Sequence, residues 1–181
     1  MSWPWPHLYE HPSSVANLAM TREHHGNEWL FFAPLYDTHS TPLAKLQSQL
    51  RDYKSSPVKN VFATQLRLAK MPLVLRRILW WLRLHYSGRK RVKRLGTFGL
   101  TTLAGQGTTI VDPKAPITTV LSYGPLDDQG LCQVTIAYDH RIMDGSFVAR
   151  VLSELQAQMN HEIVSEYEER LSTTPTSRQA A

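Results

Sequence analysis

One junction near the C-terminus constrains the fold more than any other stretch. Residues 131–139 alternate apolar and polar side chains, which is typical of a strand with one face buried. The sequence then gives His140, Asp144 and Gly145, and the apolar pattern of a helix begins near Ser146. His140 and Asp144 are therefore predicted to lie in a loop between a strand and a helix, where reactive side chains are often held.

The sequence of this junction fits either a functional or a purely structural histidine at position 140. Asp144 lies near the start of the helix, where backbone N–H groups and the helix dipole favour an ionised carboxylate. Gly145 allows a tight turn or a positive φ. A histidine four residues before an aspartate can also be purely structural, so a functional interpretation needs support from the rest of the chain.

Strand and helix patterns alternate along the remainder of the sequence. The β-rich segments are residues 14–20, 28–34, 95–103, 116–124 and 131–139, and the polar stretch 21–27 is expected to join the first two as a hairpin. Helical patterns cover residues 43–53, 58–69, 72–86 and 146–159, and Thr41 with Pro42 is the expected start signal of the first. The pattern predicts a domain of the α/β or α+β class.

The composition is that of a soluble protein with a single core. The chain has 181 residues, of which 42% are hydrophobic and 19% charged. Its only cysteine, Cys132, cannot form an internal disulfide, which favours a reducing compartment and a cytoplasmic location. No stretch reaches the roughly 20 apolar residues that span a bilayer. The histidines have no further ligands at a supporting spacing, so no metal site is expected.

Positive charge is concentrated in the middle of the chain. The net charge is +5, and the interval between Asp52 and Asp112 has no acidic residue but twelve of the twenty lysines and arginines. Five of these follow one another closely: Arg89, Lys90, Arg91, Lys93 and Arg94. The surface they form is either a solubilising face or a contact for an anionic cofactor, a membrane or an acidic partner. Nucleic acid is disfavoured, because no recognised nucleic-acid-binding module is present.

The preceding helix, residues 72–86, is amphipathic and basic and contains a pair of tryptophans. Such a helix can lie on a membrane surface, or its apolar stripe can form a core or subunit contact. Both alternatives are open from the sequence.

The junction resembles a known motif. The stretch AYDHRIMDG, residues 137–145, is similar to the HxxxDG motif of the dihydrolipoyl acyltransferases of 2-oxo acid dehydrogenase complexes, whose fold chloramphenicol acetyltransferases share. Upstream, GTFGLTTL (96–103) resembles the family's GTFTISNLG strand, and VDPKAPITTVLSYG (111–124) resembles its INPPQ…AILGVG segment. Residues 14–54 match more loosely, and the Trp-containing helix has no counterpart.

The resemblance implies a fold and a domain organisation. The expected fold is a mixed sheet flanked by helices, as in the CoA-dependent acyltransferases, lacking the first part of the usual domain. Residues 1–13 would form an extended segment, residues 14–171 the acyltransferase-like domain, and residues 172–181 a disordered tail. The family builds its site between the subunits of a trimer, so a homotrimer is implied.

The resemblance also assigns roles to residues. His140 would be the general base that takes a proton from the thiol of coenzyme A or dihydrolipoamide, so that the thiolate attacks an acyl thioester. Thr101 stands where the family has the serine that stabilises the oxyanion, and the adjacent Thr102 is an alternative. Asp144 would hold the loop by bonding an arginine, for which Arg141 is the nearest candidate.

Because coenzyme A carries several phosphate charges, Arg89, Lys90, Arg91, Lys93 and Arg94 are candidates to contact it. The predicted activity is acyl transfer between thioesters of CoA or lipoamide. The alternative is a catalytically inactive oligomeric scaffold of the same fold, apposed to a membrane through the basic Trp-containing helix.

Overall fold

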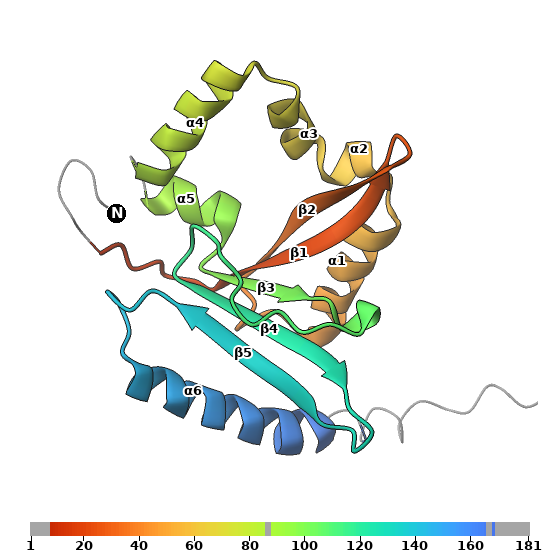
Figure 1. Cartoon of the computed structure of the whole chain (residues 1–181), viewed down its shortest axis with the longest axis vertical. Helices are drawn as coiled ribbons and strands as arrows, with labels where there is room; N and C mark the ends of the chain where they lie inside the picture. The colour runs from red at the N-terminus through yellow and green to blue at the C-terminus, as the bar shows by residue number, and fades with distance from the viewer. Residues whose placement is uncertain (1–7, 86–87, 166–167, 169–181) are drawn as a thin grey trace, which may run out of the picture. The chain divides into compact units, whose positions relative to one another are not determined.

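The strands form one mixed five-stranded sheet with the order β2-β1-β3-β4-β5 (Figure 1). The computed structural model describes residues 8–85, 88–165 and 168, without the side chains of residues 89 and 90. The chain separates into two compact units, residues 1–139 and 140–181, and the whole sheet belongs to the first.

One edge of the sheet is a long hairpin. β1 (Val15–His24) and β2 (Asn27–Tyr36) pair antiparallel along their whole length. The turn consists of His25 and Gly26, whose φ values of 54° and 75° are those of a tight two-residue turn. The hairpin was predicted correctly, but the predicted loop at 21–27 was too long. The strands continue through these polar residues to the tip because the two-residue turn keeps the backbone ladder in register up to His24 and Asn27.

The centre of the sheet is parallel. β3 (Phe98–Thr102) pairs with both β1 and β4 (Thr119–Leu126) in parallel, and β5 (Cys132–Tyr138) pairs antiparallel with β4. All three late strands were predicted, with ends that differ by a few residues. The mixed sheet confirms the predicted fold class.

The helices of the first unit lie between β2 and β3 in the chain. They are α1 (Leu43–Ser55), α2 (Val58–Val61), α3 (Ala63–Ala69), α4 (Leu73–His85) and α5 (Gly88–Leu95). A short 3-10 turn, Ala104–Gln106, follows β3. In the second unit, α6 (Gly145–Ala157) continues as a π-helical stretch, Gln158–Ile163.

Two helix boundaries differ from the prediction. Pro42, rather than Thr41, is the N-cap of α1, and no side chain caps the helix; the Pro42 carbonyl accepts the N–H groups of Lys45 and Leu46 instead. The predicted helix 58–69 is interrupted at Phe62, whose φ and ψ of −115° and 22° leave the helical region. Its ring is buried, and this tertiary packing outweighs the local helical pattern.

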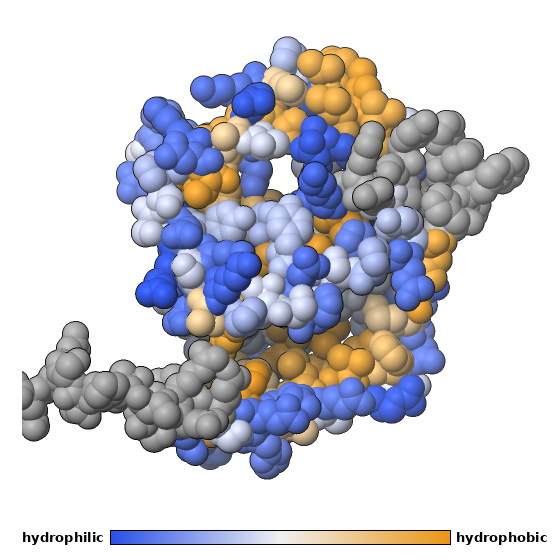
Figure 2. Space-filling view, turned by 180° about the vertical axis from the view of Figure 1, so that it is seen from behind, coloured by the Kyte–Doolittle hydropathy of each residue, from blue (hydrophilic) through white to orange (hydrophobic). Residues whose placement is uncertain are grey.

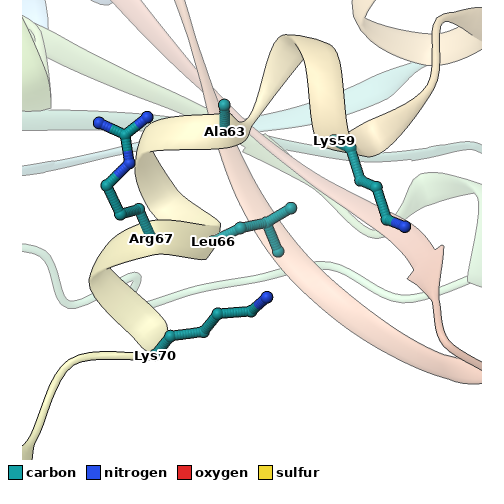
Figure 3. A pocket seen from close by; sticks show the side chains of 5 residues that line it. All are labelled: Lys59, Ala63, Leu66, Arg67 and Lys70. Carbon is teal, nitrogen blue, oxygen red and sulfur yellow. The ribbon is translucent and has the colours of Figure 1, made fainter.

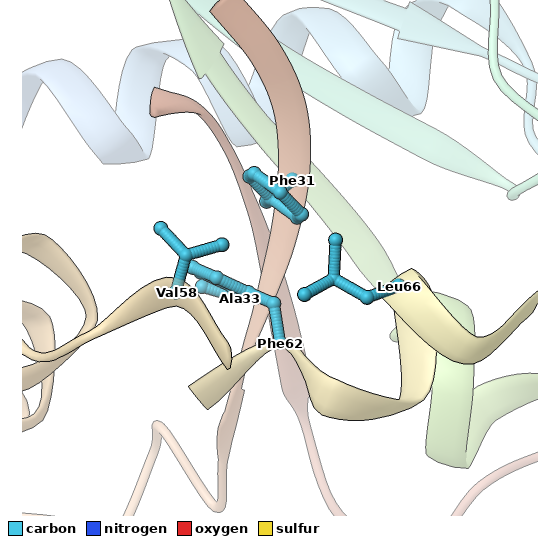
Figure 4. Close-up of a cluster of buried hydrophobic side chains, with 5 residues drawn as sticks. All are labelled: Phe31, Ala33, Val58, Phe62 and Leu66. Carbon is cyan, nitrogen blue, oxygen red and sulfur yellow. The ribbon is translucent and has the colours of Figure 1, made fainter. Parts of the chain in front are cut away.

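The core of this part of the fold lies between β2 and α2–α3. Phe31, Ala33, Val58, Phe62 and Leu66 form a buried cluster (Figure 4). The rings of Phe31 and Phe62 stack with centroids 4.6 Å apart. Gln65 completes the packing at the sheet edge, because its side-chain amide accepts from Phe32 N at 3.0 Å and donates to Phe32 O at 2.6 Å.

α4 has a different environment. None of its residues is buried, and Figure 2 shows a hydrophobic patch over it at the top of the view. The exposed large apolar residues on α4 are Leu73, Val74, Leu75, Ile78, Trp80, Trp81 and Leu82. Within the described part of the chain, no helix has the length and hydrophobicity to cross a bilayer.

The basic run forms a helix, α5, and joins the sheet at a fixed corner. Gly96 ends α5 with φ 79°, and its N–H donates to Val92 O at 2.8 Å. Thr97 then exchanges hydrogen bonds with the backbone of Val15, and Asn17 donates from its side chain to Leu95 O at 3.0 Å. The start of β3 is thereby fixed against the start of β1.

Candidate active site

The loop after β5 holds His140 through its own backbone. His140 is exposed, and its Nδ1 atom lies 3.1 Å from the carbonyl oxygen of Met143. A carbonyl oxygen only accepts hydrogen bonds, so this contact requires a proton on Nδ1. In the neutral ring, Nε2 then carries the lone pair that can accept a proton.

Asp144 fixes the other end of the loop as the N-cap of α6. Its Oδ1 accepts hydrogen bonds from Phe147 N at 2.7 Å and from Ser146 Oγ at 2.8 Å. The bond from Phe147 N, then that from Ser146, and more weakly the charge of His140, hold the pKa of the Asp144 carboxyl below its usual value. Asp144 is therefore ionised at neutral pH and secures the loop that carries His140.

The arginine partner expected for Asp144 stays a prediction. The groups that bond the carboxylate belong to the first turn of α6, and no arginine is among those that lower its pKa. Arg141 is exposed.

The two threonines of β3 differ in what their hydroxyls do. Thr102 Oγ1 donates to Tyr123 O at 2.8 Å and accepts from Ala104 N at 3.0 Å, so this hydroxyl is committed to the backbone. Thr101 is half-buried, and its hydroxyl makes no hydrogen bond within the described residues. Successive residues of a strand point to opposite faces, so Thr101 shares its face with its partner on β4, Ser122, rather than with Thr102.

The candidate cofactor-binding residues all belong to α5, and they differ in environment. Lys93 and Arg94 are exposed, whereas Arg91 is half-buried and donates to Pro116 O, in the segment that leads to β4. The positions of Arg89 and Lys90 lie in the helix, but their side chains are outside the described residues. Arg91 is thus bound to the backbone of the segment before β4, whereas the side chains of Lys93 and Arg94 are exposed.

Sequence reasoning missed two features of potential functional use. The first is the Met143 carbonyl, which contacts His140 Nδ1 and selects the neutral tautomer with its proton on Nδ1, and which no side-chain pattern reveals. The second is a pocket of about 280 Å³ lined by Lys59, Ala63, Leu66, Arg67 and Lys70. The acid-free interval after Asp52 contains its three cations and could have indicated it. Within the described residues, no group of three or more metal-ligating side chains comes together.

Comparisons with known proteins link this fold to acyltransferase cores. No protein-family model matches the chain, and no curated protein sequence is similar to it. Among solved structures, the cubic core of the pyruvate dehydrogenase multienzyme complex is similar over 82% of this chain and 54% of that chain, with 15% identity and a TM-score of 0.51. The shared property is the fold.

A second solved structure gives the same result. The dihydrolipoamide acetyltransferase of Azotobacter vinelandii, in which a serine, a histidine and an asparagine were studied for their roles in catalysis, matches with 15% identity and a TM-score of 0.50. The match covers 83% of this chain and 55% of that chain. The chain therefore spans about half the length of the structures that it matches.

Proposed function

We propose that this chain belongs to the dihydrolipoyl acyltransferase family and transfers an acyl group between thioesters of coenzyme A or lipoamide, with His140 as the general base. The observation that carries the proposal is the hydrogen bond between His140 Nδ1 and Met143 O, which in the neutral ring requires the proton on Nδ1 and the basic lone pair on Nε2. Imidazole suits this role, because a thiol with a pKa near about 8.5 is mostly protonated at neutral pH and needs a base.

The spacing of the motif supports this assignment. In the A. vinelandii enzyme, the asparagine studied for its catalytic role stands four positions after the histidine. Here Asp144 stands four positions after His140 and bonds the start of α6. Asp144 is thus a positioning residue that keeps the histidine loop in place.

The chemistry requires a base and an oxyanion donor. His140 Nε2 takes the proton of the attacking thiol, and the thiolate sulfur forms a bond to the thioester carbonyl carbon. The resulting oxyanion accepts a hydrogen bond from the Thr101 hydroxyl, which the structure leaves without another partner in its described part. When the intermediate collapses, the carbon–sulfur bond to the original thiol breaks, and His140 returns the proton to that leaving thiolate.

The test is turnover of an acyl-CoA donor with a dithiol acceptor. His140→Gln should lower kcat/KM by about a hundredfold or more, as expected for loss of a general base. His161→Gln is the matched control, because His161 is an exposed histidine in the same unit but outside the loop. Equal turnover by the wild type and His140→Gln would refute the assignment.

A second pair of variants tests the oxyanion donor and the proposed trimer together. Thr101→Val should lose about a hundredfold in kcat, and Thr101→Ser should keep most of it, because only the hydroxyl donates. If the site is built from two subunits, refolding a mixture of Thr101→Val and His140→Gln chains should restore part of the activity, since some sites then contain both groups. No restoration would contradict a site shared between subunits.

The exposed cations of α5 are proposed to contact the phosphates of coenzyme A. Lys93→Glu with Arg94→Glu should raise the KM for acyl-CoA at low ionic strength more than at high salt, because exposed charges are screened. Arg91 is a poor choice for this test, because its substitution would also remove the contact with Pro116. An unchanged KM at low ionic strength would make α5 a solubilising surface.

The exposure of α4 supports a second candidate function, a catalytically inactive scaffold apposed to an anionic membrane. The helix presents its apolar side chains to solvent and carries Arg76, Arg77 and Arg83 with no acidic residue. An amphipathic basic helix of this composition can lie in a lipid interface. Co-sedimentation with anionic vesicles should be salt-sensitive and reduced by Ile78→Ser with Trp81→Ser, and absence of binding would exclude this function.

A further inference from the structure

We propose that the pocket formed by α2 and α3, together with His24 at the tip of the neighbouring hairpin, binds a phosphate group. Its residues are different from those of the histidine loop and of α5. Its ligand is defined by chemistry alone, a phosphate carried either by a small soluble anion or by a lipid headgroup.

The pocket combines a buried apolar residue with exposed cationic side chains. Leu66 forms the floor and is 9% exposed, because it packs in the cluster with Phe31 and Phe62. Figure 3 shows Lys59 and Lys70 extending on the same side of α3 as Leu66, whereas Arg67 leaves the helix on the other side. A volume of about 280 Å³ is at the small end of the range for ligand sites, which suits a phosphate-sized group.

The hairpin adds histidines to the same cluster. Partial burial, and then the positive charges of His25, Lys59 and Lys70, lower the pKa of His24 below its ordinary value. Lys59 belongs to α2 and Lys70 follows α3, so the charges that act on His24 come from both helical elements. Its ring also contacts Trp29 edge-on, with centroids 5.8 Å apart, and Trp29 stacks on Phe31 of the core. His24 is thus linked, through the rings of Trp29 and Phe31, to the buried cluster that contains Leu66 of the pocket.

No carboxylate neutralises this cluster. Lys59, Arg67 and Lys70 make no ion pair within the described residues. The nearest acidic residues of the hairpin, Glu23 and Glu28, pair with each other across the strands, on the face opposite to that of His24 and Trp29. Cations gathered without a counter-charge repel one another, and a bound phosphate would relieve this repulsion through charge-assisted hydrogen bonds.

The cluster should respond to pH. The groups that face His24 are His25 and Asn27 on the hairpin, Arg22 on the same strand face, Lys59 on α2, and Lys70 after α3, with Arg67 also lining the pocket. In the free protein the neighbouring cations lower the pKa of His24, whereas a bound phosphate would favour its protonated form and raise its pKa. Affinity should therefore increase as the pH falls through the range of the histidines, from about pH 8 to about pH 6.

The experiment is titration calorimetry of the full chain with pyrophosphate at low ionic strength. Lys59→Gln with Lys70→Gln should weaken binding by at least about tenfold, because two charged contacts are lost. Lys45→Gln with Lys54→Gln is the matched control; it removes the same charge from exposed positions of α1 and should bind like the wild type. His24→Gln should flatten the pH dependence.

Co-sedimentation with phosphatidic acid vesicles distinguishes the two sources of phosphate. Pyrophosphate binding that depends on Lys59 and Lys70 identifies a soluble anion, and vesicle binding alone with the same dependence identifies a headgroup. Binding of neither probe would overturn the proposal. Equal weakening in both double variants would also overturn it, because binding would then depend only on the general positive charge of the surface.

Discussion

Two neighbouring helical stretches of this chain both carry apolar side chains but lie in opposite environments. α2 and α3 bury Val58, Phe62 and Leu66 against the hairpin, whereas α4 buries none of its residues. The two stretches differ in the surface against which they pack. The apolar residues of α2 and α3 pack against Phe31 and Ala33 of β2. An apolar helix becomes part of a core only where another element presents a complementary face, and without one its hydrophobic surface remains available for binding.

The largest effect expected from this comparison is at Phe62. Phe62→Ala should lower the free energy of unfolding by about 3–5 kcal/mol, because it leaves a cavity beside Phe31 and Leu66. Trp81→Ala in α4 removes a larger side chain that is 47% exposed and should change the free energy of unfolding by no more than about 0.5 kcal/mol. Chemical denaturation measures both. Because the Trp81 ring stacks on His85 of the same helix, only a loss in Trp81→Ala that depends on protein concentration would show that a second copy covers α4.

A smaller effect is expected at the corner where the helical segment rejoins the sheet. Gly96→Ala should cost about 1–3 kcal/mol, because φ is positive there. A Cβ at Gly96 would also lie 2.7 Å from Val15 O. Gly26→Ala is the control; Gly26 has a similar φ, but a Cβ there would meet nothing within 4 Å, so Gly26→Ala should cost less than Gly96→Ala by the contribution of the close contact. If the two variants lose equal stability, the close contact with β1 is not what fixes this corner.

The smallest effect concerns the contact of α5 with β2. The Tyr36 hydroxyl donates to Lys93 O at 3.0 Å, and Tyr36→Phe should cost up to about 1 kcal/mol for the lost hydrogen bond. Tyr123→Phe should be neutral, because the Tyr123 hydroxyl makes no hydrogen bond within the described residues. Thermal denaturation of both variants gives the comparison, and equal midpoints would mean that the hydrogen bond from Tyr36 does not stabilise the contact of α5 with β2.

The parts of the fold that the sequence predicted are those with local signals. The late strands carry β-branched residues bounded by glycine, proline or aspartate, and the hairpin was visible from its two apolar runs. The break at Phe62 was not predictable, because it depends on the burial of that ring against Phe31. The helix over 88–95 was missed because its charge, rather than its helical period, dominated the interpretation.

The candidate site also has features that the local sequence predicts and features that depend on the fold. His140 and Asp144 stand out as a motif, and the N-cap role of Asp144 follows from its place before α6. Which threonine has an uncommitted hydroxyl depends on the register of β3 against β4, and the partner of His140 is a backbone carbonyl. The catalytic roles of His140 and Thr101 remain predictions that the activity measurements above test.

The parallel pairing of β1 with β3 has a consequence for the order of folding. Ala16 pairs with Phe98, so every helix of the first unit lies within the loop that this pairing closes. Closing a long loop has an entropic cost that a two-residue hairpin turn does not have. We therefore expect the β1–β2 hairpin to form early, with β1 waiting as an unpaired edge until β3 arrives. On the ribosome this edge would be exposed throughout synthesis of the helical segment, which makes it the part of the nascent chain most vulnerable to misassociation.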